Sequence, residues 1–275
     1  MSPGEIIHTI LEEFPYALYG SMLIGVLCSF LGVYVVARRV VFLGAVMTQI
    51  SVLGLAVTFL PFLAIPHTIG SLVITIGAVI ALSRMLTGRS VPREAVLGTV
   101  FVIAIGARIL VMQLSPRVEV AEIENLLRGD ILFVTPELFY LMAGVFAAAM
   151  AIHLFLYKEF TYTTFDPETA STQGFASQRW DMAFYLIAGV VISVATHIVG
   201  DLFVFGFLVI PPVIAMLIAR RVRHIFLVST LIGGIVPAIG LYFAFALDLP
   251  SSPTIVVAGV VLLGLVWVVS LVRKS

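Results

Sequence analysis

Long apolar stretches separated by short polar loops dominate the chain. About 20 mostly apolar residues are enough to cross a bilayer as a helix. The pattern predicts eight such stretches and a ninth candidate: 16–37, 40–60, 67–83, 95–114, 136–157, 183–200, 202–219, 225–247 and 254–272. We therefore expect an all-α, polytopic membrane protein with about eight to nine transmembrane helices, organised as one domain over residues 1–275.

The pair 183–200 and 202–219 needs separate treatment. The two segments are short, only Gly200-Asp201 separates them, and Pro211-Pro212 lies inside the second. Proline removes a backbone donor and kinks a helix. We expect two short helices that meet near the outer surface, the second of them broken; a re-entrant path for one of them is the alternative.

Two polar regions flank or interrupt the spans. In residues 1–15, apolar side chains recur at helical spacing, which predicts an amphipathic helix on the membrane surface. The segment 158–182 is a hydrophilic segment on the inner side that is long enough to hold structure, and it carries its own helix signals. Asp166 fits an N-cap, Pro167 the first helical position and Gly174 the C-terminal stop. Such a short capped helix is more often a docking element than a catalytic one.

Composition supports a bilayer protein. Hydrophobic residues make up 61% of the chain and charged residues 11%, with a mean hydropathy of +1.18. Soluble domains are about 45–50% apolar and about 25% charged, so a soluble enzyme, a nucleic-acid-binding protein and a disordered chain are excluded. The single cysteine, Cys28, excludes an internal disulfide. We expect membrane lipid as the surroundings, no nucleic-acid partner and no cofactor.

The distribution of basic residues predicts the orientation. If the loop of Arg38 and Arg39 is cytoplasmic, twelve of the 15 Lys and Arg residues fall on that side. This places the N-terminus outside and the C-terminus inside a multi-pass protein of the cytoplasmic membrane. The formal net charge of zero is then the sum of a basic inner side and an acidic outer side.

Ionisable groups within spans are costly and therefore candidates for function. Arg108 lies mid-span and needs a carboxylate, carbonyls or water; Asp201 and Asp130 are possible partners, and snorkelling to the headgroups is the alternative. His197 and Asp201, four residues apart, either share a metal ion or a proton or mark a polar helix end. Thr48 and Gln49 belong to a polar stripe that serves either the path or helix packing. The translocation-path candidates are thus Thr48, Gln49, Arg108, His197 and Asp201.

Several sequence blocks in order carry a family resemblance: GVYVVARRVVFLGAVMTQISVLGLA, VLGTVFVIAIG, LLRGDILFV, FDPETASTQGF, VGDLFVFGFLVIPPVIAMLIA and SSPTIVVAG. Together they resemble the permease subunits of ABC importers for zinc, manganese or iron. The chain carries no GxxxxGK[ST] loop, so it is not expected to be an enzyme on its own.

The resemblance implies a permease dimer, with a second copy or a related chain, on cytosolic ATP-binding subunits. An extracytoplasmic solute-binding protein would deliver the cargo, and transport would follow alternating access. The FDPETASTQGF helix resembles the coupling helix that fits the ATPase. Its expected coupling residues are Phe165, Asp166, Pro167, Glu168, Ala170 and Gly174.

One departure concerns the metal itself. The family's second span usually carries an Asp followed four residues later by a His, where this chain has Ala45 and Gln49, and SVLG replaces VLPG. Neither side chain is a ligand that a divalent ion prefers. Three explanations are open. The metal ligands lie elsewhere in the chain, for example at His197 and Asp201; the cargo is a metal complex that needs no direct protein ligand; or this chain pairs with a second permease chain that carries the usual ligands. We assign no metal ligand.

Two other classes of protein fit parts of the pattern. Arg108, His197 and Asp201 are also compatible with an ion- or proton-coupled secondary transporter, which needs no ATPase. The absence of the expected ligands at Ala45 and Gln49 is compatible with a membrane scaffold subunit that transports nothing.

Overall fold

A computed structural model describes residues 3–60, 67–87, 91–114, 131–174 and 177–272. These residues form helices and no strand. The helices are α1 Pro3–Glu12, α2 Pro15–Ala37, α3 Phe42–Thr58, α4 His67–Thr87, α5 Arg93–Leu114, α7 Pro136–Phe155, α8 Tyr157–Phe165, α9 Pro167–Thr172, α10 Ser177–Val199, α11 Asp201–Ile218, α12 Val222–Leu247 and α13 Ser251–Val272, with a 3₁₀ turn η1 at Ile131–Phe133.

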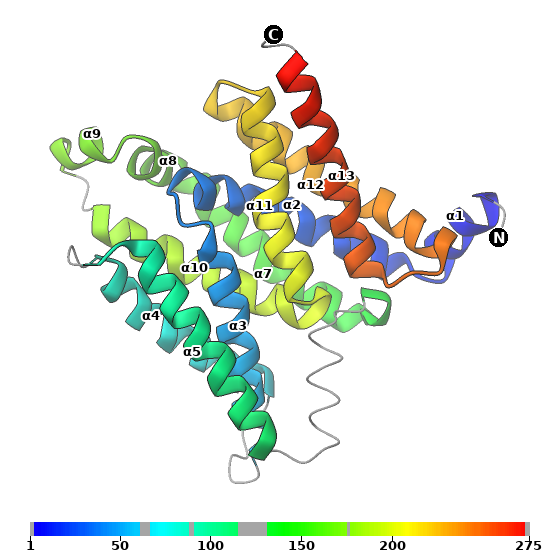
Figure 1. Cartoon of the computed structure of the whole chain (residues 1–275), viewed down its shortest axis with the longest axis horizontal. Helices are drawn as coiled ribbons and strands as arrows, with labels where there is room; N and C mark the ends of the chain where they lie inside the picture. The colour runs from blue at the N-terminus through cyan, green and yellow to red at the C-terminus, as the bar shows by residue number, and fades with distance from the viewer. Residues whose placement is uncertain (1–2, 61–66, 88–90, 115–130, 175–176, 273–275) are drawn as a thin grey trace.

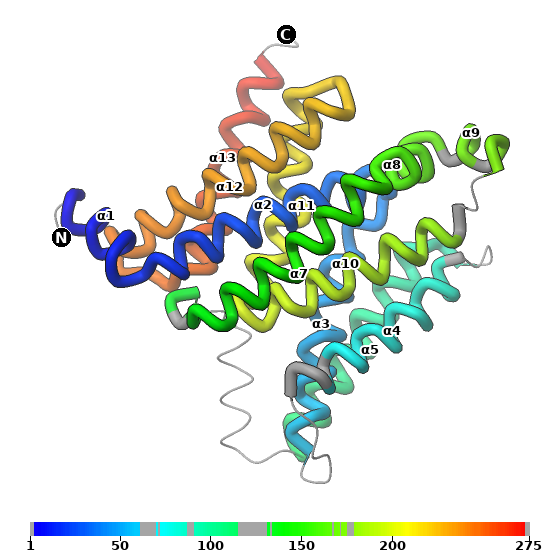
Figure 2. Tube along the Cα trace, turned by 180° about the vertical axis from the view of Figure 1, so that it is seen from behind, coloured from blue at the N-terminus to red at the C-terminus, as the bar shows by residue number. Residues whose placement is uncertain are grey.

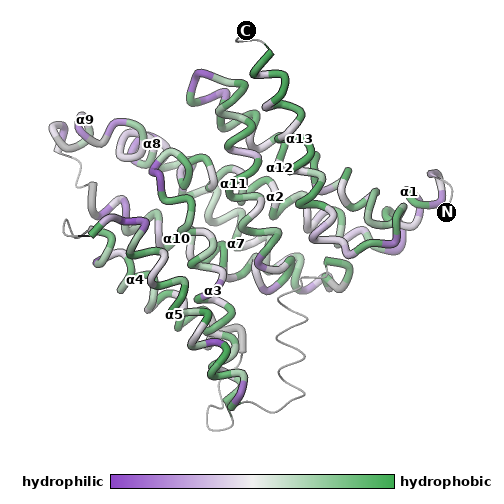
Figure 3. The backbone as a smooth tube through the Cα atoms, in the orientation of Figure 1, coloured by the Kyte–Doolittle hydropathy of each residue, from purple (hydrophilic) through white to green (hydrophobic). Residues whose placement is uncertain are grey.

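The expected spans are all present as helices. In the described part of the chain, seven helices are long and apolar enough to cross a membrane, and the apolar helices Phe42–Thr58 and Leu72–Leu86 are shorter. Hydrophobic residues colour most of each long helix, whereas hydrophilic residues gather at α8, α9 and the helix ends (Figure 3). The prediction of an all-α polytopic membrane protein is confirmed.

Most of the long helices that the structure describes fall into two groups. Helices α2, α11, α12 and α13 pack together, and α3, α4, α5 and α10 form the second group (Figure 1). Contacts of α11 with α3 and of α10 with α2 join the groups, and α7 packs on both α2 and α10. Seen from behind, α7 crosses in front of this junction (Figure 2). The Arg38 end of α2 lies beside α8, because Arg38 donates a hydrogen bond to Thr164 of α8.

Helix α2 fits closely against two proline-containing helices. A Cβ at Gly32 would collide with the carbonyl oxygen of Leu208 on α11, and one at Gly25 with the carbonyl oxygen of Gly233 on α12. Those carbonyls are the ones that Pro212 and Pro237 leave without an intrahelical donor, since proline lacks an N–H. Small residues on α2 thus let it approach the proline sites, as at many membrane helix interfaces.

The pair of helices around Gly200 differs from the expectation in part. Helix α11 is short, at 18 residues, but continuous through Pro211 and Pro212, and α10 is 23 residues long. The expected break at the prolines is therefore wrong. The Ser29 hydroxyl on α2 donates to the Phe207 carbonyl at 3.4 Å, which replaces the bond that Pro211 cannot make. Gly200, with φ of 83°, separates the two helices.

The N-terminal amphipathic pattern forms α1. Ile6 and Ile10 are buried, at 3% and 5% exposure, whereas Ile7 and Leu11 are about half exposed, at 50% and 47%. Helix α1 contacts α2 and α12. One apolar side of α1 therefore packs on the bundle, and its location at a membrane surface stays a prediction.

Replacing Gly32 by valine should destabilise the protein by about 1–3 kcal/mol, because the added side chain overpacks the α2–α11 contact. The thermal midpoint of the detergent-solubilised protein measures the effect. Gly264→Ala on α13 is the control, since a Cβ there meets no heavy atom within 4 Å. Equal midpoints for the Gly32 variant and the wild type would contradict this account of the packing.

Candidate functional site

A chain of polar side chains, buried at its centre and partly exposed at both ends, joins three helices. The Arg108 Nη1 group on α5 donates to Gln49 Oε1 on α3 at 2.9 Å, and Gln49 Nε2 donates to Asp201 Oδ2 on α11 at 3.0 Å. Gln49 is 8% exposed, so both ends of its amide are engaged in a buried position. We call Arg108, Gln49 and Asp201 the polar triad.

The polar triad shows which groups partner the guanidinium of Arg108. The Arg108 guanidinium donates to Gln49, and the Gln49 amide links it to the Asp201 carboxylate. Arg108 Nε is buried and has no hydrogen-bond partner among the described residues. The alternative partner, Asp130, lies outside those residues.

The other two path candidates lie outside the triad. The Thr48 hydroxyl donates to the Ala45 carbonyl of its own helix at 2.9 Å and is 1% exposed. His197 is on α10 and Asp201 on α11, on either side of Gly200, so they do not share one continuous helix. Within the described ranges, no group of three or more His, Cys, Asp or Glu side chains could hold a metal ion.

The second candidate region is the segment formed by α8 and α9. The Thr169 backbone N–H donates to Asp166 Oδ1 at 3.1 Å, which is the N-cap expected from the sequence. Gly174 has φ of 85°, a left-handed conformation that suits the end of a helix. The expected start and stop of the short helix are both confirmed.

Side chains of this segment divide into a buried and an exposed set. Phe165 packs against the core, with its ring centroid 6.4 Å from that of Phe226, and Ala170 is fully buried. Asp166, Glu168 and Gly174 are exposed. Pro167 is the first residue of α9. The arrangement anchors one side of the segment and leaves the other accessible to a partner.

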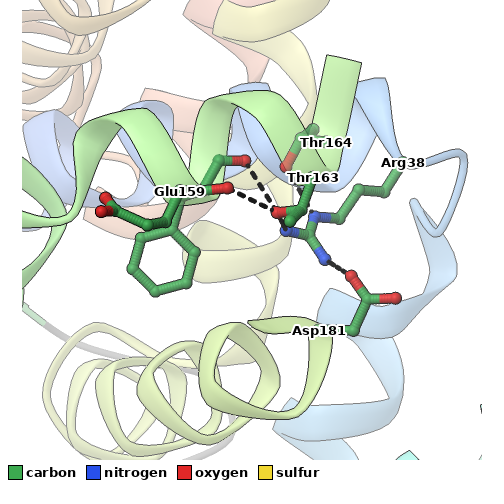
Figure 4. Close-up of polar contacts among 6 residues, drawn as sticks. Arg38, Glu159, Thr163, Thr164 and Asp181 are labelled. Atoms are coloured by element: carbon green, nitrogen blue, oxygen red, sulfur yellow. Dashed lines mark hydrogen bonds and ion pairs between the residues drawn. The ribbon is translucent and has the colours of Figure 1, made fainter. Parts of the chain in front are cut away.

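Sequence reasoning missed Arg38, which links this segment to the spans. At the end of α2, its Nε donates to Thr164 Oγ1 at 2.9 Å and its Nη2 to Thr163 Oγ1 at 3.4 Å. The guanidinium also forms an ion pair with Asp181 on α10 (Figure 4). The basic pair Arg38-Arg39 was the available signal, but its spacing does not reveal partners more than 100 residues away.

Loss of the Asp166 cap should loosen α9. Hydrogen bonds from the Thr169 side chain and backbone lower the pKa of Asp166. The cap is therefore formed at neutral pH and is lost only as the pH falls through that lowered pKa. We expect Asp166→Ala to accelerate amide hydrogen exchange in α9 at neutral pH, and Asp166→Ser, a good N-cap, to preserve wild-type exchange. Identical exchange in Asp166→Ala and wild type would contradict the capping role.

Comparison with known proteins agrees with this architecture. The chain is 26% identical to the manganese transport system membrane protein MntD of Bacillus subtilis, over 84% of this chain and 83% of that protein. It is 22% identical to the chelated iron transport system membrane protein YfeC of Yersinia pestis, over 91% and 86%. The structure of PsaBC from Streptococcus pneumoniae in complex with Fab shares the fold, with a TM-score of 0.83 at 18% identity over 96% of this chain and 95% of that chain.

A family model settles the relationship suggested by the sequence blocks. The model of the ABC 3 transport family matches residues 11–272. That range includes all the apolar helices, the polar triad and the α8–α9 segment. The chain belongs to the ABC 3 transport family.

Proposed function

We propose that this chain is the permease subunit of an ABC importer that moves a transition metal, as an ion or a complex, across the cytoplasmic membrane by alternating access. The observation that carries the proposal is a capped, exposed helix α9 on a polytopic member of the ABC 3 transport family. Manganese and chelated-iron transport in the names of relatives supports a metal cargo.

Helix α9 is the proposed docking element for the ATPase. Helix α8 is anchored in the core, and α9 presents Asp166 and Glu168 to solvent. A partner can therefore bind α9 without unfolding the spans. A short rigid helix transmits such a contact as a rigid-body movement. The proposed coupling residues are Phe165, Asp166, Pro167, Glu168, Ala170 and Gly174.

The polar triad favours a metal complex over a bare divalent ion. Its guanidinium and carboxylate offset each other, and the Gln49 carbonyl already accepts a bond from Arg108. A dehydrated divalent cation needs free carboxylate, imidazole or thiolate ligands. A chelate carries its own ligands, so it can pass this site without them. Ligands supplied by His197 and Asp201, or by a partner permease chain, are the competing explanations.

The proposed assembly contains two permease chains, either two copies of this one or this chain with a related partner. Cytosolic ATP-binding subunits supply hydrolysis, and an extracytoplasmic solute-binding protein delivers the cargo. The N-terminus lies outside and the C-terminus inside, which puts Arg38 and α9 on the cytosolic side. This orientation follows from the distribution of Lys and Arg and places α9 where an ATPase can reach it.

Affinity purification of the tagged chain from its own host tests the assembly. We expect an ATP-binding subunit to co-purify in a complex that hydrolyses ATP. A secondary transporter or a scaffold without an ATPase would yield the chain alone. Purification without any ATP-hydrolysing partner would contradict the proposal.

A further inference from the structure

The guanidinium of Arg38 connects three helices in a nearly solvent-free position. It donates to Thr163 and Thr164 of α8, pairs with Asp181 of α10, and its Cζ lies 4.6 Å from the centroid of the Phe184 ring. The exposed fractions of the Arg38 and Asp181 side chains are 4% and 14%. Figure 4 shows the Arg38 fork between the two threonines and the aspartate.

An aromatic contact holds α8 at the same place. Phe160 is fully buried and stacks on His153 of α7, with 4.7 Å between ring centroids and 19° between planes. Its ring also lies 5.5 Å from that of Trp180 and 6.3 Å from that of Tyr34. Helix α8 is thus fixed to α2, α7 and α10 on its apolar side, and Arg38 fixes its polar side.

Stability alone does not explain a buried ion pair. Removing charges from water costs free energy that their attraction often only offsets, so replacement of both partners by apolar residues is frequently neutral. What the arginine fork adds is geometry: several donors held in one plane. Here those donors fix the distance between the end of α2, the end of α8 and the start of α10.

We propose that Arg38 is a positioning residue that locks the α8–α9 segment to α2 and α10, so that movement of α9 by the ATPase reaches the spans as a rigid-body motion. The inference rests on the proposed function. The main contacts of α9 are with α8 and α10, so a movement of α9 is passed on through these two helices. Without Arg38, only the aromatic side of α8 stays attached, so α8 and α9 can tilt relative to α2 and α10, and most of the ATPase-driven movement is lost before it reaches the spans.

The test uses the full complex of this chain with its ATPase in vesicles of phosphatidylethanolamine and phosphatidylglycerol. Cys28 is the sole cysteine of the chain and is buried, so a bimane label can be attached at Leu249→Cys. Leu249 is 50% exposed and precedes Ser252, whose hydroxyl donates to the Val199 carbonyl at the far end of α10 at 3.0 Å. The label therefore reports movement at the end of α10 opposite Asp181 when ATP is added.

We expect Arg38→Gln to reduce the ATP-induced fluorescence change about tenfold, with ATPase association and ATP hydrolysis retained, while the thermal midpoint falls because Asp181 loses its buried partner. A merely structural role would lower the midpoint in the same way but leave the fluorescence change of the assembled complex at its wild-type size. Arg39→Gln is the matched control, because Arg39 is adjacent and exposed and should leave the response unchanged.

Two milder variants cover a failure of Arg38→Gln to assemble. Arg38→Lys keeps the charge opposite Asp181 but loses the fork, and Thr164→Val removes one attachment to α8; each should give a partial loss of response. A full response in Arg38→Gln, or in both milder variants, would overturn the inference, as would the absence of any ATP response in the labelled wild-type complex. If the wild-type chain binds no ATPase at all, the proposed function fails instead.

Discussion

Replacement of Arg108 by glutamine should reduce transport by more than about tenfold and destabilise the protein by about 1–3 kcal/mol. The substitution removes the donor to Gln49 Oε1 and leaves the Asp201 carboxylate without its counter-charge. Uptake by cells that express the variant and thermal unfolding of the purified protein measure the two effects. Arg223→Gln is the control, since Arg223 is an exposed arginine at the start of α12.

A double-mutant cycle isolates the polar triad from other consequences of the change. If Gln49 links the two charges, Arg108→Gln combined with Asp201→Asn should be less destabilising than the sum of the single changes, by about 0.5–3 kcal/mol. Strictly additive changes in the free energy of unfolding would contradict a linked triad. They would instead favour the alternative that the Arg108 side chain snorkels towards the lipid headgroups.

Disruption of the α9 region should strongly reduce binding of the ATPase without unfolding the chain. Gly174→Pro cannot adopt the observed φ of 85°, because the proline ring fixes φ near −65°. Glu168→Arg reverses an exposed charge on the proposed docking surface. We expect each variant to lose at least about 90% of the co-purified ATPase, as for other changes that remove a binding hot spot, while the chain itself stays folded.

Matched substitutions distinguish docking from general damage. Gly174→Asn keeps a residue that tolerates the left-handed conformation, and Glu94→Arg reverses an exposed charge at the start of α5. Both should retain the ATPase. Unchanged ATPase binding by Gly174→Pro and Glu168→Arg would remove α9 from the coupling mechanism.

Features that depend on neighbours in the sequence were predictable. The spans follow from apolar length, and α9 follows from Asp166 and Gly174, whose contacts or conformations are local. The Asp166 cap, for example, joins residues three positions apart. Local patterns of this kind carry their own structural cause, so the sequence could indicate them before any packing was known.

Features that depend on the packing of distant residues were not predictable from the sequence. Gln49 meets Asp201 across 152 positions, and Arg38 meets Asp181 across 143. No spacing rule brings such residues together. The continuity of α11 is a similar case, because the Ser29 hydroxyl that compensates Pro211 lies 178 positions from Phe207. The sequence pointed to Arg108 as needing a partner, but only the packed helices show that an amide bridges it to the carboxylate.

Uptake into vesicles distinguishes an ATP-driven permease from a secondary transporter. The chain is reconstituted with its ATPase and solute-binding protein, or alone, and radioactive manganese, zinc and ferric citrate are supplied separately. We expect ATP-dependent accumulation of at least one probe by the full complex, abolished by a hydrolysis-deficient ATPase and insensitive to collapse of the proton gradient. Accumulation by the chain alone, driven by a proton gradient and independent of ATP, would identify a secondary transporter and contradict the proposed function.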